Sequence, residues 1–190
     1  RRLLFRSHLL SMGIDKLWRK RAVKLISKKD PKDILDIATG TGDFAIESLK
    51  LKPNSITGVD ISNGMLEKGK EKMIKKGHDK IITLQYGDSE NLPFEDESFD
   101  AITVGFGVRN FEDLEKGLSE MLRVLRPGGI VAVLKYSKPK KFPVKQGYTF
   151  YSKHIIPKVG KSISKDDTAY KYLPDSIAAF PEGQGFLDIL

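Results

Sequence analysis

Short apolar runs alternate with amphipathic stretches from residue 32 onward. The apolar runs are rich in Ile, Val and Leu and are bounded by Gly, Pro, Asn or Asp, which is typical of strands buried on both faces of a parallel sheet. Strands are expected at 33–38, 55–60, 81–86, 99–105 and 129–136, with helices at 43–51, 63–76 and 112–125. This alternation predicts right-handed crossovers and an α/β, doubly wound three-layer fold.

Both end regions depart from this alternation. Residues 1–29 predict a basic helix with an apolar stripe made of Leu17, Trp18, Val23, Leu25 and Ile26. Residues 142–163 mix aromatic side chains with lysines and predict a helical insertion after the fifth strand. We expect both stripes to pack on the core. Between them, Arg126-Pro127-Gly128-Gly129 is expected to end the last helix and turn the chain into the fifth strand.

The composition is that of a globular domain. The chain has 190 residues, 39% of them hydrophobic and 31% charged, and no apolar run approaches the roughly 18 residues that span a bilayer. There is no cysteine, which excludes disulfides, thiolate catalysis and thiolate metal sites. We therefore expect a single domain over 1–190, a cytoplasmic location and no metal site.

The net charge of +8 is unevenly distributed. Residues 1–30 hold ten Lys and Arg against two Asp, residues 135–171 hold ten Lys against two Asp, and the stretch between these flanks is acidic overall. Basic flanks of this kind suit a nucleic-acid backbone or an anionic membrane surface. Solvated lysine-rich helix faces explain them equally well.

A glycine turn follows the first expected strand. Glycines let the backbone of Gly40-Thr41-Gly42 turn tightly and approach a ligand, and the next helix begins at once. With Ala45 the pattern is G-x-G-x-x-A, which does not separate one nucleotide ligand from another. Asp60 lies twenty residues after Gly40, at the end of the second strand, where a carboxylate suits the ribose of either NAD or S-adenosylmethionine.

Three features favour S-adenosylmethionine. Asp36 and Asp43 flank the glycines with negative charge, which suits an ammonium and a sulfonium better than a pyrophosphate. Gly87-Asp88-Ser89 ends the third strand at the same sheet edge, well placed for the adenine amino group. The five strands also pass without a second glycine fingerprint. The competing interpretation is that these carboxylates only cap helices and turns.

Several motifs together resemble those of the ubiquinone/menaquinone biosynthesis C-methyltransferases. The resemblance covers roughly residues 8–185, and the segments at 106–110 and 170–174 are specific to that family. The motifs are Asp36–Asp43, Leu92-Pro93-Phe94, Phe106-Gly107-Val108-Arg109-Asn110, Arg123–Gly129, Tyr136-Ser137-Lys138-Pro139 and Tyr170–Ser176.

The resemblance implies a Rossmann-like class I methyltransferase sheet and methylation of a ring carbon on a polyprenylated quinol, such as demethylmenaquinol, with S-adenosylhomocysteine as coproduct. It divides the chain into an N-terminal helical region (1–30), a cofactor-binding core (31–136) and a helical substrate-cleft insertion (137–175). The sheet of such enzymes usually has seven strands. We expect this chain to end at Leu190 before the last two of them.

The resemblance also implies that Thr41, Asp60, Asp88, Ser89 and position 105 contact the cofactor. Position 105, commonly Ser in the family, is Gly here, so a side-chain contact there is lost. The full set of expected cofactor-binding residues is Asp36, Gly40, Thr41, Gly42, Asp60, Ile61, Asp88, Ser89 and Gly105.

Arg109 and Asn110 are the expected catalytic residues. Arginine stays protonated, so Arg109 is interpreted as stabilising a developing phenolate or orienting water, while Asn110 holds the ring oxygen; an ion pair at the sheet edge is the alternative for Arg109. His154 is a candidate base, and Tyr148 and Tyr151 are expected to line an apolar cleft for the prenyl tail.

Two other functions stay open from the residues alone. One is methylation of RNA or of a different small molecule, and the other is a nucleotide-binding module without catalysis. The chain shows no stacked-aromatic or base-reading motif, so peripheral membrane contact through the basic flanks is favoured over a nucleic-acid partner.

Overall fold

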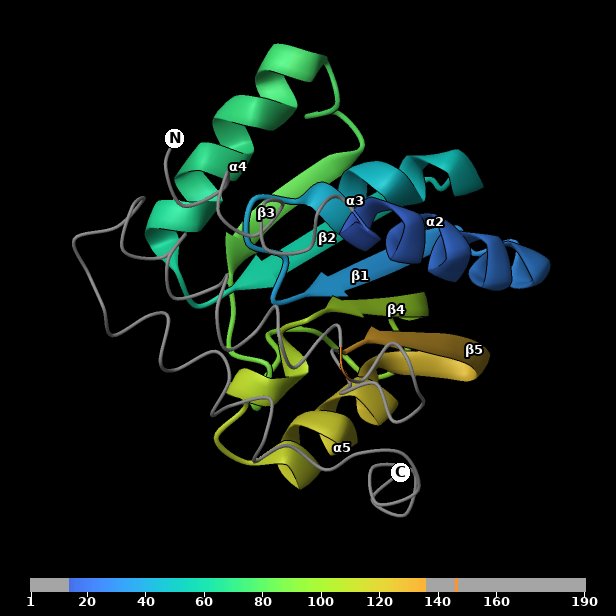
Figure 1. Ribbon diagram of the computed structural model, residues 1–190. Helices are drawn as coiled ribbons and strands as arrows, with labels where there is room; N and C mark the ends of the chain where they lie inside the picture. The colour runs from blue at the N-terminus through green and yellow to red at the C-terminus, as the bar shows by residue number, and fades with distance from the viewer. Residues whose placement is uncertain (1–13, 136–145, 147–190) are drawn as a thin grey trace. The chain divides into compact units, whose positions relative to one another are not determined.

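A computed structural model describes residues 14–135 and, beyond them, only Gln146 (Figure 1). The described strands and the helices α2 to α5 belong to the unit Arg1–Lys135. Apart from Gln146, the predicted insertion 137–175 lies outside the described residues, and with it Tyr148, Tyr151 and His154. Residues 1–13 of the predicted N-terminal helix also lie outside them.

Five parallel strands form one sheet in the described part of the chain. They are β1 (Asp33–Ile37), β2 (Ser55–Asp60), β3 (Ile82–Tyr86), β4 (Phe99–Gly105) and β5 (Leu125–Leu134). Their spatial order is β3-β2-β1-β4-β5, so the direction of winding reverses at β1. Ligands of doubly wound folds bind beside such a switch point. The predicted doubly wound, Rossmann-like α/β fold is confirmed.

Helices flank the sheet, and its central strands β1 and β4 are buried on both faces. The helices are α2 (Ile14–Ile26), α3 (Asp43–Ser48), α4 (Asn63–Lys76) and α5 (Leu114–Val124), with short 3-10 helices η1 (Ser27–Lys29), η2 (Leu49–Leu51) and η3 (Val108–Asn110). Figure 1 shows α4 beside β3 and α5 beside β5, in agreement with their contacts. Along β1, Ile34 packs with side chains of α2, α3 and α4, while the alternate residue Leu35 is buried toward the other face.

The fifth strand begins earlier than the sequence predicts. Leu125 already pairs with Phe99, so the glycine motif lies inside β5 and the expected turn before the strand is wrong. A register shift between Phe99 and Ala101 accommodates it. Gly128 adopts φ of +80°, and a Cβ at Gly129 would lie 2.8 Å from the Asp100 carbonyl oxygen. The glycines therefore permit a bulged strand rather than a turn.

The stripe predicted for α2 is only partly buried. Val23 and Ile26 are in the core, whereas Leu17 and Leu25 are 58% and 62% exposed. Leu17 and Ile26 are nine residues apart, about two and a half turns, so they point in opposite directions. Neither α2 nor any other helix among the described residues is long and apolar enough to cross a membrane.

Candidate active site

The expected site residues follow the carboxyl ends of four neighbouring strands. Gly40-Thr41-Gly42 follow β1, Asp60 ends β2, Asp88-Ser89 follow β3 and Gly105 ends β4. Because these strands are parallel, their carboxyl ends lie at one edge of the sheet. The structure therefore brings the predicted residues to one edge, next to the switch point at β1.

The glycine turn needs both of its glycines. Gly40 and Gly42 have φ of +57° and +76°, where side chains are strained, and a Cβ at Gly42 would lie 2.5 Å from the Met73 methyl carbon. The Thr39 N–H donates to the Val59 carbonyl over 3.0 Å, which attaches the turn to β2. The turn is thus held in one conformation at the sheet edge, with Gly40 partly exposed and Thr41 and Gly42 buried.

Asp60 holds the turn from the adjacent strand. One of its oxygens accepts the Gly40 N–H at 2.7 Å, and the other accepts the Ser62 N–H at 2.8 Å. Each oxygen of a carboxylate has room for a second donor. The half-buried carboxylate can therefore bind a pair of hydroxyls while it keeps its backbone contacts. Its predicted contact with a ribose fits this geometry and stays a prediction.

Asp36 lies beneath the turn and is buried. Its two oxygens accept the hydroxyls of Thr39 at 2.5 Å and Thr103 at 2.7 Å. Burial raises the pKa of Asp36 to about 6, although these two hydrogen bonds and one from the Ala45 backbone lower it. The geometry gives Asp36 a role in supporting the turn from below; a direct contact with a cofactor stays a prediction.

A lysine reduces the negative charge that the sequence places beside the turn. The Lys72 ammonium on α4 lies 3.1 Å from an Asp43 carboxylate oxygen and 3.0 Å from the Thr41 hydroxyl. The argument from Asp43 for a cationic ligand is weakened, because part of its field is cancelled at short range. No local pattern indicates this pair, since the two residues are 29 positions apart.

The end of β4 carries the family-specific motif in a strained conformation. Phe106 has φ of +66°, and Ala38, at the end of the adjacent β1, has φ of +52°. A Cβ at Gly107 would lie 2.2 Å from the Ala38 Cβ, so only glycine fits there. The Phe106 ring also contacts Trp18 of α2 at 5.9 Å between centroids. Strain of this kind is concentrated at functional sites.

Arg109 and Asn110 follow this motif in η3. Val108 is buried and anchors the short helix, Arg109 is half-buried and Asn110 is exposed. The Asn110 N–H donates to the Gly107 carbonyl at 2.9 Å. The structure thus places both predicted catalytic residues just past the end of β4, beside the glycine turn of β1.

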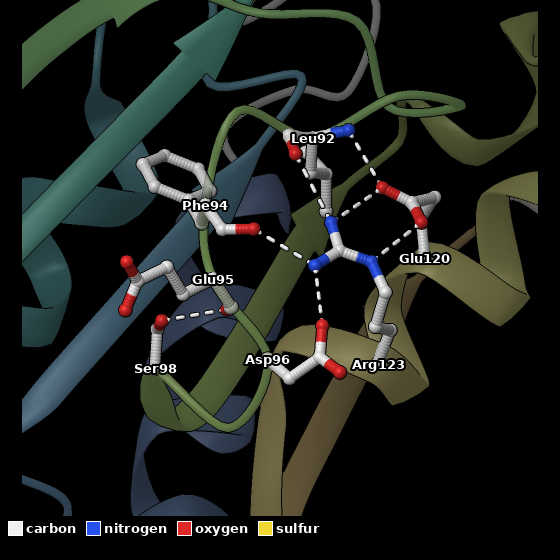
Figure 2. Close-up of polar contacts among 7 residues, drawn as sticks. All are labelled: Leu92, Phe94, Glu95, Asp96, Ser98, Glu120 and Arg123. Carbon is white, nitrogen blue, oxygen red and sulfur yellow. Dashed lines mark hydrogen bonds and ion pairs between the residues drawn. The ribbon is translucent and has the colours of Figure 1, made fainter.

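Asp88 and Ser89 begin a long segment between β3 and β4. Asp88 is exposed, and its carboxylate accepts the Glu90 N–H at 2.9 Å. Further along, Arg123 of α5 holds the segment by donating to the carbonyls of Leu92 at 3.1 Å and Phe94 at 2.8 Å (Figure 2).

The Arg123 guanidinium is itself fixed by carboxylates. It donates twice to Glu120, at 2.7 and 2.8 Å, and once to Asp96 at 2.8 Å. Glu120 also accepts the Leu92 N–H at 2.8 Å, and these bonds lower the pKa of Glu120 and raise that of Arg123. The motif Arg123–Gly129 contains the predicted turn into the fifth strand. Nothing in it indicates that Arg123 and Glu120 form a clamp that holds the segment between β3 and β4.

Comparison with known proteins identifies the family to which this site belongs. The profile of the ubiE/COQ5 methyltransferase family matches residues 5–190. The chain belongs to the ubiE/COQ5 methyltransferase family. It is a methyltransferase with S-adenosylmethionine as its cofactor, and the glycine turn with the acceptor oxygens of Asp60 fits such a group.

Relatives and solved structures agree with this assignment. A Bacteroides fragilis protein named demethylmenaquinone methyltransferase is 49% identical over 185 residues, which cover 97% of this chain and 76% of that protein. A Geotalea daltonii protein named ubiquinone/menaquinone biosynthesis C-methyltransferase UbiE is 46% identical, over 96% of this chain and 78% of its own length. The crystal structure of YcgJ from Bacillus subtilis superposes with a TM-score of 0.57 at 27% identity, covering 72% of this chain and 58% of that one.

Proposed function

We propose that this chain methylates a ring carbon of a polyprenylated quinol, as in the conversion of demethylmenaquinol to menaquinol. The observation that carries the proposal is the 49% identity, over nearly the whole chain, to a protein named demethylmenaquinone methyltransferase. The geometry supports it, because the Phe106–Asn110 segment lies at the same sheet edge as the glycine turn.

The cofactor contacts proposed here come from four strand ends. The turn at Gly40–Gly42 would hold the methionine part, Asp60 the ribose hydroxyls, and Asp88-Ser89 the adenine, with Ile61 and Gly105 beside them. When bound, the cofactor supplies a methyl group for an in-line displacement. The half-buried Asp60 carboxylate favours hydroxyl donors, and the fixed turn lets a ligand approach the backbone closely.

Arg109 and Asn110 are proposed to act on the acceptor ring. A quinol carbon becomes a stronger nucleophile when its hydroxyl oxygen gains negative charge. The Arg109 guanidinium, which stays protonated, stabilises that charge, and the exposed Asn110 amide orients the ring oxygen. The cofactor would supply the methyl group as the new carbon–carbon bond forms, S-adenosylhomocysteine would leave, and the ring carbon would pass its proton to water.

Methyl transfer is the direct test. Incubation of the 190-residue chain with radiolabelled S-adenosylmethionine and a short-chain demethylmenaquinol is expected to label the quinol. Asp60→Ala should weaken the binding of S-adenosylhomocysteine by about 1–3 kcal/mol, because charge-assisted hydrogen bonds are lost. Asp79→Ala, which removes an exposed carboxylate from the loop before β3, is the matched control and should bind normally. Cofactor binding without any labelled quinol would contradict the proposed acceptor.

The described part of the chain also supports a peripheral membrane contact. The outward face of α2 carries exposed basic side chains alongside two exposed leucines: Leu17, Arg21, Lys24, Leu25 and Lys28. These positions share one side of the helical surface and its extension into η1. A face of this kind suits an anionic bilayer surface, where the polyprenyl tail of the acceptor would reside.

A further inference from the structure

Glu90 lies between the two halves of the proposed site. It directly follows Asp88-Ser89 on the cofactor side. One of its carboxylate oxygens accepts the N–H groups of Glu112 at 2.6 Å and Asp113 at 2.9 Å. These two amides come two to three residues after Asn110. A single side chain thus links the segment after β3 to the segment after β4.

Local hydrogen bonds attach Glu90 to the cofactor side. The Glu90 N–H donates to the Asp88 carboxylate, and the Asn91 N–H donates to the Asp88 carbonyl at 3.1 Å. Two residues beyond Glu90, Leu92 is 3% exposed and bonded to both Glu120 and Arg123 (Figure 2). A displacement of Glu90 therefore moves Asp88 and Ser89 with it.

On its acceptor side, the link leads into α5. Asp113 caps α5 by accepting the Lys116 N–H at 3.0 Å, and the Gly117 N–H donates to its carbonyl at 3.0 Å. Gly117 is buried, and a Cβ there would lie 2.5 Å from the Phe111 ring. The amides that Glu90 binds are therefore attached to α5 and to the residue directly after Asn110.

We propose that Glu90 is a positioning residue that couples cofactor binding at Asp88-Ser89 to the placement of Arg109-Asn110. The inference rests on the proposed function, since it concerns the two halves of that same site. When the adenine side is occupied and Asp88 is fixed, the Glu90 carboxylate holds the chain at Glu112 and Asp113, and with it η3, in one position. Occupation of one half thus orders the other.

The test combines binding with hydrogen exchange and needs no acceptor. In the wild-type chain, S-adenosylhomocysteine is expected to slow exchange both in peptides covering 87–91 and in peptides covering 108–114. In Glu90→Ala its Kd should rise about tenfold, and protection should remain only at 87–91. Glu90→Gln keeps an acceptor oxygen, so it should restore part of the protection at 108–114. Glu95→Ala is the matched control, since its side chain lies on the same segment and points away from Arg123 (Figure 2).

Three results would overturn the coupling. One is a wild-type chain in which the ligand protects 87–91 but not 108–114, and another is a Glu90→Ala chain in which both segments are still protected. The third is a loss of folding free energy in Glu90→Ala with an unchanged Kd, which would make Glu90 a structural residue only. Failure of the proposed function looks different: in that case the ligand binds with coupled protection, but no quinol is methylated. A wild-type chain that does not bind the ligand overturns both.

Discussion

At the scale of single residues, the buried Asp36 carboxylate links the stability of the site to pH. Its pKa of about 6 exceeds the ordinary value of 3.8 because burial penalises its charge. Between these two values the folded chain keeps a proton that the unfolded chain has already lost. The free energy of unfolding therefore decreases as the pH rises through this window, and the loss is complete above about pH 6.

We expect this loss to be visible against Asp36→Asn. Two pKa units correspond to about 3 kcal/mol, and the variant lacks the titrating group. Urea unfolding of both chains from pH 4 to pH 8 gives the difference in unfolding free energy at each pH. The stability of the wild type relative to the variant should fall between about pH 4 and pH 6 and then level off. A difference that stays flat, or that rises with pH, would show that Asp36 is not held in the buried environment described.

At the scale of elements, the ends of β1 and β4 pack closely because Gly107 has no side chain. Gly107→Ala would place a Cβ 2.2 Å from the Ala38 Cβ, so the end of β4 and η3 must shift. We expect a loss of about 1–3 kcal/mol in unfolding free energy, as for other overpacked sites, together with weaker methyl transfer.

A second substitution should reverse this loss. Ala38→Gly removes the opposing Cβ and also suits the φ of +52° at that position. The double variant Ala38→Gly/Gly107→Ala should therefore recover most of the stability that Gly107→Ala loses, as measured by thermal unfolding of all four chains. If the effects of the two substitutions on stability simply add, the contact between positions 38 and 107 does not cause the loss seen in Gly107→Ala.

Arg123 is expected to control the order of the β3–β4 segment. Arg123→Gln removes charged donors from the carbonyls of Leu92 and Phe94, which should cost about 1–3 kcal/mol of unfolding free energy. Arg123→Lys keeps the charge but cannot reach all these partners from one point, so its loss should be smaller but measurable. Arg126 offers a comparison, since it bonds to Asp33 and Asp100 at the opposite strand ends. Arg126→Gln should lower stability without loosening the segment, as hydrogen exchange at 88–96 would show.

The regular elements were predictable because each shows a local pattern. Apolar runs and their bounding residues predict the strands and α4, and the spacing from Gly40 places Asp60 at the same sheet edge. Contacts between distant residues carry no such pattern. Lys72 gives no sign in the sequence of its pairing with Asp43, and nothing in the Arg126–Gly129 motif indicates that Leu125 would already pair with Phe99. Leu17 and Leu25 are exposed, contrary to the prediction, because they lie on a different side of α2 from Val23 and Ile26.

At the scale of the whole molecule, charge and apolar surface on α2 predict a salt-sensitive association with membranes. Vesicles that contain phosphatidylserine should bind the chain, and binding should weaken as the salt concentration rises from about 0.05 M to about 0.5 M, because screening shortens the reach of the basic residues. Flotation assays measure both effects.

The contribution of the two exposed leucines of α2 can be tested separately. The double variant Leu17→Ser/Leu25→Ser should bind vesicles more weakly at every salt concentration, since both side chains are exposed on the basic face. Leu122→Ser changes a leucine that is 73% exposed on α5 and should leave binding as it is. Equal binding by all of these chains would remove α2 from the contact.

The clamp formed by Arg123 and Glu120 constrains how such enzymes can be recombined. Residues 87–98 and α5 are joined through carbonyls, amides and a guanidinium. A chimera that takes the segment from one relative and the helix from another would keep its partners only if both ends of the clamp match. We therefore expect these two pieces to transfer between relatives as one unit.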